Sequence, residues 1–418
     1  MRVIADLHIH SKYSRSCSQA LTLENIAKWC EKKGIDLVST ADFTHPAWFG
    51  SIKSELVETA PGIFMLKNKK SPCKFILGTE ISCIYSKGGQ VRRLHHCVYV
   101  PDLKSAEKLI KKLESRKCNL HSDGRPIIGM PSKELLKILL DISESSMLIP
   151  AHAWTPWFAI FGSKSGYDSI EQCFEELSSH ICAIETGLSS DPAMNRRLSG
   201  LDNIFLVSNS DAHSSANLGR EANVFDLDEI TYENVFNILR RRDAKKFLFT
   251  IEFYPEEGKY HFDGHRECKV RFSPAKTKKH KGICPECGKK LTLGVMNRVD
   301  NLADRKEEEG QKNYVPFKSI VPLDVILSEV FDQGKKTKKV LQTYEKMIAE
   351  LGPEFEILLD KPIADIESAF GEVAAQAIQR VRDGKLIIEP GYDGEYGTVK
   401  IFSDKEKKLN KPAQKALF

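Results

Sequence analysis

The sequence predicts an α/β fold that is followed by a short cysteine-containing segment and a mainly helical C-terminal part. In residues 1–225, short apolar runs typical of strands alternate with segments typical of helices. Such alternation favours parallel strands arranged as a barrel or as a doubly wound sheet. Beyond residue 300, apolar residues recur at helical spacing.

Length and composition set broad limits on the class of protein. With 418 residues and 41% hydrophobic content, the chain can bury a large core, and more than one. No apolar stretch is long enough to span a bilayer, and we expect no leader because the first predicted strand begins at residue 2. The net charge of +5 is too mild to indicate a nucleic-acid partner by itself. We therefore expect a cytoplasmic protein whose eight scattered N-terminal cysteines are buried apolar groups.

The first strand ends in two histidines. Residues 2–5 are apolar and β-branched enough to form a buried strand, and His8 and His10 follow. Side chains two residues apart on an extended chain point to the same side, so both imidazoles can face one point. This pair suggests a metal site, although an H-x-H pair alone is weak evidence.

The later strands of this region also end in metal-binding residue types. After a helix over residues 22–33, stopped by Gly34, we expect strands at 35–40, 74–79, 93–100, 147–151, 181–184 and 203–207. The residues at or after these strands are Asp42, Glu80, His95, His152, Glu185, Asp211 and His213. Strand ends meet at one face of a β/α barrel. Polar residues often follow strands for structural reasons alone. In that case, however, Ser, Lys, Asn and Gly would be expected as often as His, Asp and Glu.

These motifs resemble the PHP (polymerase and histidinol phosphatase) family. The matching segments are Asp-Leu-His-Ile-His at 6–10, Thr-Ala-Asp at 40–42, Gly-Thr-Glu at 78–80, Ala-His at 151–152 and Ser-Asp-Ala-His at 210–213. The resemblance implies a distorted seven-stranded β/α barrel over residues 1–258. It also implies up to three metals, usually zinc or manganese, that serve phosphoester hydrolysis.

The resemblance assigns ligands to each metal. It places His8, His10, Glu80 and Asp211 on the first metal; Glu80, His95 and His152 on the second; and Asp42 with His213 on the third. Asp211, Glu80 and His152 would serve catalysis. The family usually has His at the position of Asp42, where His45 could substitute or instead cap a helix. His96 competes with His95, which fits the family pattern better.

Long polar and aromatic loops lie between residues 121 and 220. Such loops after barrel strands usually form a binding surface. We expect substrate contacts from Arg125, Lys164 and Tyr167. The candidates for a binding pocket are Trp154, Trp157, Phe158 and Tyr167, although these aromatic residues can equally belong to the core.

Residues 259–297 have the spacing of a zinc-binding module. His265-x2-Cys268 and Cys284-x2-Cys287 are separated by 15 residues, as in paired zinc knuckles. A closed four-ligand site is structural, and a disulfide is disfavoured in the cytoplasm. The surrounding lysines and arginines form either a solvated loop or a surface that contacts phosphates. These residues are Lys276, Lys278, Lys279, Lys281, Lys289, Lys290, Arg298 and Arg305.

The third part, residues 298–418, is expected to be mainly helical and to contact DNA, with Arg298 as one contact. Helices are predicted at 322–331, 338–351 and 363–381. Residues 391–402 resemble a short segment near the C-terminus of superfamily 1 DNA helicases. This similarity suggests an interaction segment, and a sliding clamp or another repair protein is a candidate partner.

The order of barrel, zinc module and helical part resembles the endonuclease Q family. That resemblance implies cleavage of double-stranded DNA on the 5′ side of deaminated bases (uracil, hypoxanthine, xanthine) or abasic sites. It makes Arg125, Lys164 and Tyr167 predicted DNA contacts, and the four loop aromatic residues candidates for a base pocket. The products would carry a 3′-hydroxyl and a 5′-phosphate. The alternatives are a small-molecule phosphatase of the histidinol-phosphate type, which needs no zinc module, and a non-catalytic DNA-binding adaptor, which needs no convergent ligands.

Overall fold

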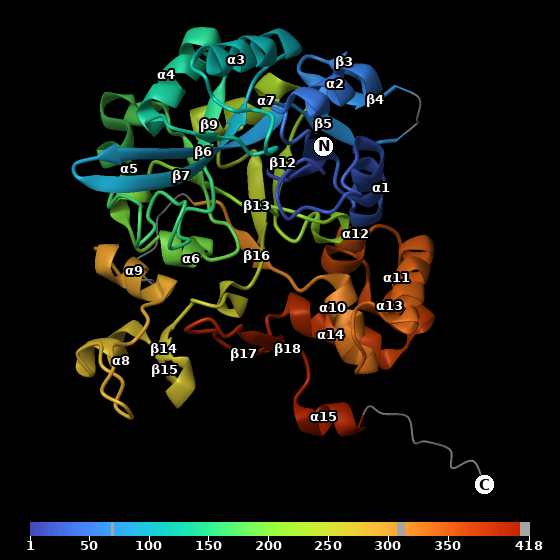
Figure 1. The fold of residues 1–418 in the computed structure, drawn as a ribbon. Helices are drawn as coiled ribbons and strands as arrows, with labels where there is room; N and C mark the ends of the chain where they lie inside the picture. Colours follow the sequence, from blue (N-terminus) through green and yellow to red (C-terminus); the bar gives the residue numbers. More distant parts are fainter. Residues whose placement is uncertain (68–70, 307–313, 410–418) are drawn as a thin grey trace.

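The computed structural model describes residues 1–67, 71–306 and 314–409. Figure 1 shows the N-terminal strands and helices together at the top of the molecule. The cysteine-containing segment and the C-terminal helices lie side by side below them. None of the helices in these described ranges is both long and apolar enough to cross a membrane.

A mixed sheet of eight strands has β1 near its middle. In spatial order, its strands are β16 (Phe317–Ser319), β13 (Phe247–Glu252), β12 (Ala222–Asp226), β1 (Arg2–Asp6), β2 (Leu37–Ser39), β5 (Lys74–Ile76), β4 (Ile63–Leu66) and β3 (Leu56–Ala60). Strand β1 is parallel to β2 and antiparallel to β12, with Ala5 opposite both Leu37 and Asn223. Because β1 is covered on both sides, four of its five residues are buried.

Two further groups of strands lie next to this sheet. A four-stranded sheet has the order β8 (Ile127–Ile128), β6 (Gly78–Lys87), β7 (Gln90–Tyr99) and β9 (Met147–Pro150), and β10 (Ala183–Glu185) pairs in parallel with β11 (Phe205–Val207). Only Leu77 separates β5 from β6. Glu80 therefore lies within β6, whereas the sequence had predicted it directly after a strand. The chain after β11 is hydrogen-bonded to the chain after β1. The mixed α/β class is therefore confirmed.

Local sequence signals explain the helices of the N-terminal part. Helix α1 (Leu23–Lys33) begins after Thr22, whose side chain accepts a hydrogen bond from the Asn25 N–H, and ends at Gly34 with φ of 80°. The other helices are α2 (Pro46–Glu55), α3 (Leu103–Ser115), α4 (Ser132–Ile142), α5 (Ile170–Phe174), α6 (Pro192–Asn195) and α7 (Tyr232–Arg241). Short 3₁₀-helices occupy Glu175–His180, Ser199–Leu201, Ser215–Asn217, Pro255–Glu257 and Arg266–Cys268.

The cysteine-containing segment packs against a hairpin from the C-terminal end of the chain. It consists of strands β14 (Asp263–His265) and β15 (Val270–Phe272) and helices α8 (Pro274–Lys279) and α9 (Val295–Leu302). The hairpin of β17 (Ile387–Glu389) and β18 (Thr398–Lys400) lies beside it in Figure 1. The Phe262 N–H donates to the Gly391 carbonyl at 2.9 Å. A Cβ on Gly264 would lie 2.3 Å from the Tyr392 ring, so only glycine permits this contact.

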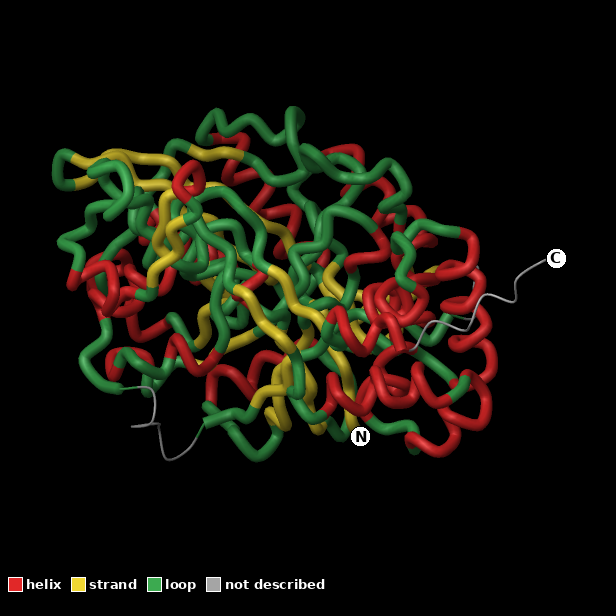
Figure 2. Tube along the Cα trace, turned by 90° about the horizontal axis from the view of Figure 1, so that it is seen from below, coloured by secondary structure: helices red, strands yellow, loops and turns green. Residues whose placement is uncertain are grey.

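The C-terminal part is helical, as the sequence predicted. Its helices are α10 (Leu323–Phe331), α11 (Lys338–Leu351), α12 (Glu354–Leu359), α13 (Ile363–Phe370), α14 (Glu372–Arg382) and α15 (Asp404–Leu409), and most of them gather on one side of the molecule (Figure 2). The single helix predicted over 363–381 is two helices, because Gly371 between them adopts φ of 86°.

The three segments defined by the sequence interleave in space. Strand β16 comes from the C-terminal part, yet it pairs in parallel with β13 of the N-terminal sheet, with Thr250 opposite Phe317. The boundaries drawn at residues 258 and 297 remain predictions. Residues 307–313 and 410–418 of the third segment lie outside the described residues.

Candidate metal centre

Four polar side chains from distant parts of the chain meet where β1 ends. The group contains His8, His10, Glu80 and Asp211, and one ligand atom of each lies within 4.8 Å of the others. His10 Nε2 is 3.0 Å from Asp211 Oδ1 and 3.3 Å from Glu80 Oε2. Three of these side chains are buried, and only Asp211, with its side chain 25% exposed, opens to solvent. The open side of the group is therefore at Asp211.

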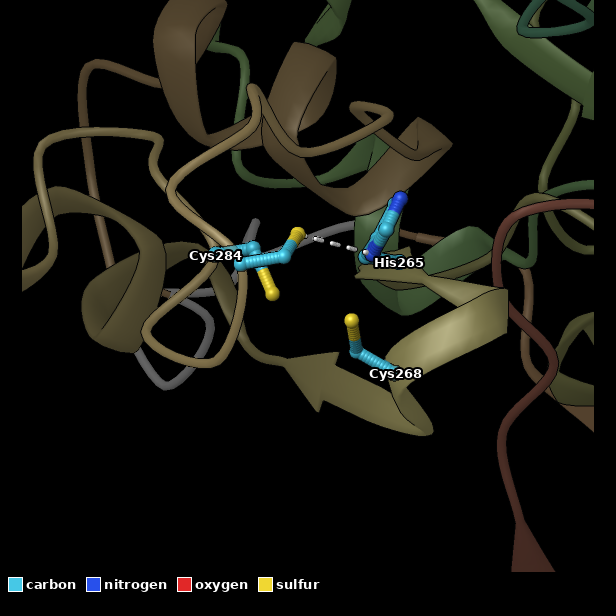
Figure 3. A group of neighbouring side chains, drawn as sticks. His265, Cys268 and Cys284 are labelled. Atoms are coloured by element: carbon cyan, nitrogen blue, oxygen red, sulfur yellow. Dashed lines mark hydrogen bonds between the residues drawn. The ribbon is translucent and has the colours of Figure 1, made fainter.

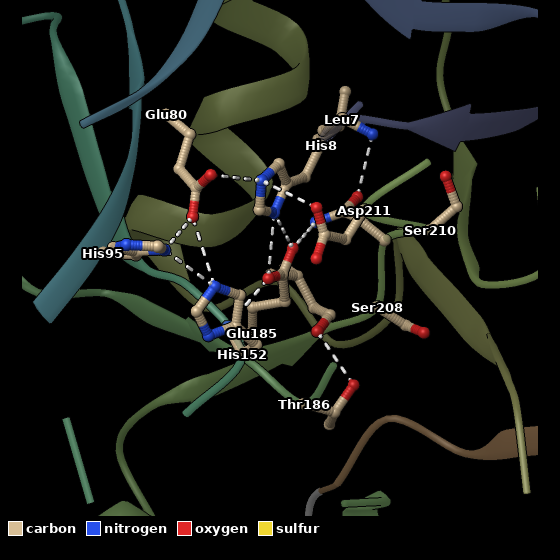
Figure 4. A network of polar contacts seen from close by, with 12 residues as sticks. Leu7, His8, Glu80, His95, His152, Glu185, Thr186, Ser208, Ser210 and Asp211 are labelled. Atoms are coloured by element: carbon tan, nitrogen blue, oxygen red, sulfur yellow. Dashed lines mark hydrogen bonds and ion pairs between the residues drawn. The ribbon is translucent and has the colours of Figure 1, made fainter. Parts of the chain in front are cut away.

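A second ligand group shares Glu80 with the first. Glu80 Oε1 lies 2.6 Å from His95 Nδ1 and 3.1 Å from His152 Nε2. The other oxygen of the same carboxylate, Oε2, faces His8 and His10. Figure 4 shows Glu80 between His95 and His8 in this arrangement. One carboxylate thus connects two adjacent ligand groups, as a bridging ligand would.

The buried donor atoms fit a cation. His8 Nε2 is fully buried and has no hydrogen-bond partner among the described residues, although it faces Glu80 Oε2 at 3.6 Å and Asp211 Oδ1 at 3.8 Å. Burial lowers the pKa of His10, but the surrounding carboxylates outweigh this effect and raise the pKa well above its ordinary value. Burial also opposes ionisation of Glu80, yet the neighbouring His95 and Arg125 keep its pKa far below normal. The group therefore favours added positive charge, which a divalent metal supplies.

Glu185 contacts one ligand of each group and supports its orientation. Its carboxylate is fully buried and lies 3.0 Å from His8 Nδ1, which leaves His8 Nε2 facing the ligand group. It also accepts hydrogen bonds from the backbone N–H of His152 at 2.8 Å and from Asn209 Nδ2 at 2.9 Å. The sequence marked Glu185 as a strand end but gave it no role, because its contacts depend on how the strands meet.

Asp42 and His213 are not brought together as a third ligand group. Asp42 Oδ2 accepts hydrogen bonds from Ser11 N, Ser11 Oγ and Ser14 Oγ, while its Oδ1 lies 3.4 Å from His10 Nδ1. The His213 ring packs 4.6 Å from the His10 ring, and its Nδ1 is 2.8 Å from the Asp211 carbonyl. No potential metal-binding group among the described residues contains either residue. The third metal thus remains a prediction.

Three of these residues have strained backbones. Asp42, His152 and Asp211 adopt φ values of 41°, 31° and 46°. Non-glycine residues rarely adopt positive φ, and such strain clusters at functional sites. The backbone conformations are consistent with the choice of this region as the candidate site.

The two competing histidines lie outside the ligand groups. His96 Nε2 is 2.7 Å from Ser132 Oγ, on the opposite face of β7 from His95. His45 occupies the N-cap position of α2, but its side chain makes no capping hydrogen bond. Instead, its Nε2 is 3.2 Å from the His121 carbonyl, and its ring stacks on Tyr13.

The predicted DNA contacts fall into different environments. Arg125 reaches the metal centre, with Nη1 3.1 Å from Glu80 Oε2, and Lys164 is exposed. Tyr167 is buried, and its hydroxyl is 3.0 Å from that of Tyr85. Arg298 donates to the carbonyls of Phe161 and Tyr167 and to Asp168, so its guanidinium is used within the protein.

The four candidate aromatic residues of the base pocket also differ in exposure. Trp154 is a core residue, with its indole N–H bonded to Asn195 Oδ1 at 2.7 Å. Tyr167, as noted, is buried. Phe158 is half-buried and packs its ring 4.6 Å from the His95 ring. Trp157 is 44% exposed and is therefore the only one of the four that offers a substantial open surface.

His265, Cys268, Cys284 and Cys287 form a separate ligand group at one end of the molecule. Figure 3 shows the side chains of His265, Cys268 and Cys284 gathered from β14, the adjacent turn and the loop after α8. His265 Nδ1 lies 3.5 Å from Cys287 Sγ. Burial opposes ionisation of Cys284, but backbone N–H groups of Cys287 and Glu286 donate to its sulfur and bring its pKa below the ordinary value. The ligand set and its compactness are those of a structural metal site.

Known proteins are similar to this chain in sequence and structure. Residues 322–385 match the family model described as the MJ0043 C-terminal domain. The chain is 33% identical over 252 residues to the uncharacterized protein MJ0043 of Methanocaldococcus jannaschii, a match that covers 59% of this chain and 31% of that protein. This chain thus spans about a third of the length of MJ0043.

Two solved structures match over the whole chain. The lesion-specific endonuclease PfuEndoQ from Pyrococcus furiosus has a TM-score of 0.85 and 30% identity, with 98% of this chain and 99% of that chain covered. Endonuclease Q in complex with a 27-mer duplex substrate that carries an abasic lesion has a TM-score of 0.84 and 30% identity, with 100% of both chains covered. Because this likeness in sequence and fold extends over essentially the whole length of the chains, the protein belongs to the endonuclease Q family.

Proposed function

We propose that this protein is a metal-dependent endonuclease that cuts DNA at lesions. The observation that carries the proposal is the pair of ligand groups joined by Glu80, in a chain of the endonuclease Q family. Two adjacent metals can generate hydroxide near neutral pH and stabilise both oxygens of an in-line phosphoryl displacement. We infer zinc or manganese as the metal, because imidazole and carboxylate ligands suit both.

The protein's own residues would hold and orient these ions. His8, His10 and Asp211 would bind one ion, His95 and His152 the other, with Glu80 between them. Arg125, next to Glu80 on the open side, is suited to contact a non-bridging phosphate oxygen. Asp211 and His213 are partly exposed and would meet the scissile phosphate first. Asp42 would hold the His10 ring, whether or not a third metal binds.

The substrate we propose is duplex DNA that contains an abasic site or a deaminated base. An abasic duplex is the substrate in the endonuclease Q complex that this chain resembles along its whole length. Cleavage on the 5′ side of the lesion would leave a 3′-hydroxyl and a 5′-phosphate. We also propose that the strands around the metal centre form the distorted barrel of the PHP fold, with their ends at the cleavage site.

The remaining parts would support DNA binding. A zinc ion at the three cysteines and His265 would hold the module between residues 259 and 297 together, and its exposed lysines would contact phosphates. The C-terminal part would extend this surface, and the segment at 391–402 is the candidate contact for a clamp or repair protein. These roles explain why a phosphoesterase site is joined to additional domains.

An end-labelled duplex with a single deoxyuridine or abasic site tests the function. With manganese or zinc, we expect one nick on the 5′ side of the lesion and none in an undamaged duplex. Equal cutting of both duplexes would indicate a nonspecific nuclease. No cutting of either, with rapid hydrolysis of p-nitrophenyl phosphate, would instead support the phosphatase. Relabelling the new 5′ end before and after phosphatase treatment determines the product ends.

A further inference from the structure

A pocket of about 650 Å³ lies along β7, the strand that carries His95. It is lined by the start of β7, by the loop at 157–168 and by Arg298 of α9. Arg93 in this pocket precedes His95 by two residues on β7, so both side chains lie on the same face of the strand. The loop is fixed to the same strand, because the His95 N–H donates to the Phe158 carbonyl at 3.0 Å. The pocket is therefore held in place by a proposed metal ligand.

The pocket carries positive charge that the protein does not neutralise. Arg93 and Lys164 are exposed, and within the described parts of the chain neither side chain has an ion-pair or hydrogen-bond partner. Asp168 is the only carboxylate in the lining, and it already pairs with Arg298 at 2.7 Å. An anion that enters the pocket would thus meet two free cations.

An exposed aromatic surface accompanies these cations. Trp157 lines the same pocket with 44% of its surface exposed, whereas Trp48 and Trp154 are buried and Trp29 is half-buried. Its neighbour Phe158 packs on the ring of His95, so the loop that carries the indole is anchored at a proposed metal ligand. A free aromatic face beside unpaired cations is the combination that proteins use to bind unpaired nucleotides.

We propose that this pocket binds a nucleotide that flanks the cut on the cleaved strand, with its base stacked on Trp157 and its phosphate between Arg93 and Lys164. This inference rests on the proposed DNA substrate and adds a second contact point beside the metals. Stacking is tolerant of sequence, so the pocket would contribute affinity and position rather than lesion choice. A duplex bound only through its outer backbone would use the lysine and arginine but would not cover the indole.

Tryptophan fluorescence of the full-length protein tests the stacking. Titration with a lesion duplex should quench the wild-type emission, and Trp157→Phe should remove most of that quenching. Trp157→Ala should weaken DNA binding roughly 5- to 150-fold, the range for loss of one base–aromatic stack. Unchanged quenching in Trp157→Phe would overturn the inference, because the remaining tryptophans would then be the ones that respond.

A double variant, Arg93→Gln with Lys164→Gln, tests the phosphate contacts. The slope of log Kd against log salt should fall by about one to two, because two counterion-releasing contacts are lost. The matched control is Lys104→Gln with Lys111→Gln, two exposed lysines on α3 without a partner among the described residues, which should leave the slope unchanged. The metal content of all variants should equal that of the wild type, which excludes indirect damage through His95.

These measurements separate the pocket from the function itself. The wild type could nick the lesion duplex while both sets of pocket variants bind it as tightly as the wild type and with the same salt slope. That result would contradict the pocket inference and leave the proposed endonuclease function intact. If the wild type neither nicks nor binds DNA, the proposed function fails, and the pocket inference fails with it.

Discussion

Glu185 and His8 are joined by a buried contact of 3.0 Å between the carboxylate and imidazole Nδ1. The same carboxylate accepts the backbone N–H of His152, a member of the second ligand group. One side chain that binds neither proposed metal thus orients a ligand of each. Such supporting contacts fix the tautomer of a histidine ligand and strengthen its metal bond.

Replacing Glu185 with Gln should weaken metal binding at both proposed sites. The amide keeps the shape of the carboxylate but loses the charge that favours the Nδ1–H tautomer, so we expect a loss of roughly 10- to 100-fold in metal affinity. Calorimetric titration of the metal-free protein with Mn²⁺ measures it. Glu354→Gln is the control, because it neutralises another buried carboxylate that lies in the C-terminal part. Equal affinity in wild type and Glu185→Gln would contradict the supporting role.

Asp211→Asn should slow cleavage strongly while the fold is retained. The substitution removes the negative charge of the most open ligand of the first group. Metal catalysis supplies several kcal/mol, and losing about 2–4 kcal/mol slows the reaction roughly 30- to 1000-fold. Single-turnover nicking and thermal unfolding should be measured on the same preparation. A normal nicking rate would show that Asp211 is not a ligand.

Cys284→Ser should release one metal ion per chain and loosen the module around β14 and β15. A structural site contributes its metal-binding free energy to folding, so the loss of one ligand should destabilise the whole module. Elemental analysis and limited proteolysis report the two effects. Cys118→Ser serves as the control, since Cys118 is half-buried and belongs to none of the ligand groups found in the described residues. Unchanged zinc content in Cys284→Ser would rule out this site.

Glu252 should make the protein less stable as the pH rises. Burial raises the pKa of Glu252 from 4.5 to about 8. The folded chain then keeps a proton that the unfolded chain releases, so the free energy of unfolding falls between pH 4.5 and about 8. Glu252→Gln should flatten this decrease, because an amide does not titrate and still accepts the hydrogen bond from Thr186. Urea midpoints at several pH values check this; an identical slope in both proteins would refute it.

The candidate ligands could be found in the sequence because their signals are local, and the resemblance to the PHP family sorted them into two groups. His8 and His10 follow a short buried run, and Asp211 follows another, so each could be recognised from a few neighbouring residues. The structure brings these side chains within ligand distance of one another. The helical character of the C-terminal part was likewise readable from apolar spacing. Gly371 was a local signal against one continuous helix over 363–381, since glycine inside a helix costs about 1 kcal/mol relative to alanine.

The features that the sequence could not predict depend on contacts between distant segments. Glu185 touches His8 across the meeting of separate strands, and no spacing in the sequence encodes that distance. Arg298 was expected at DNA because it is basic, but the carbonyls of a loop more than a hundred residues away occupy its guanidinium. The sequence also does not reveal which side chains are exposed. Trp154 and Trp157 look alike in sequence, but of these two only Trp157 is open to solvent.

The hairpin of β17 and β18 gives the chain an order of assembly during synthesis. A ribosome releases the segment with His265 and the three cysteines well before it releases the hairpin that packs on that segment. The four ligands are close in sequence, so a metal can gather them while Tyr392 is still being made. A ribosome that stalls before residue 387 would therefore leave a nascent chain that has His265 and all three cysteines but lacks the hairpin that covers Gly264.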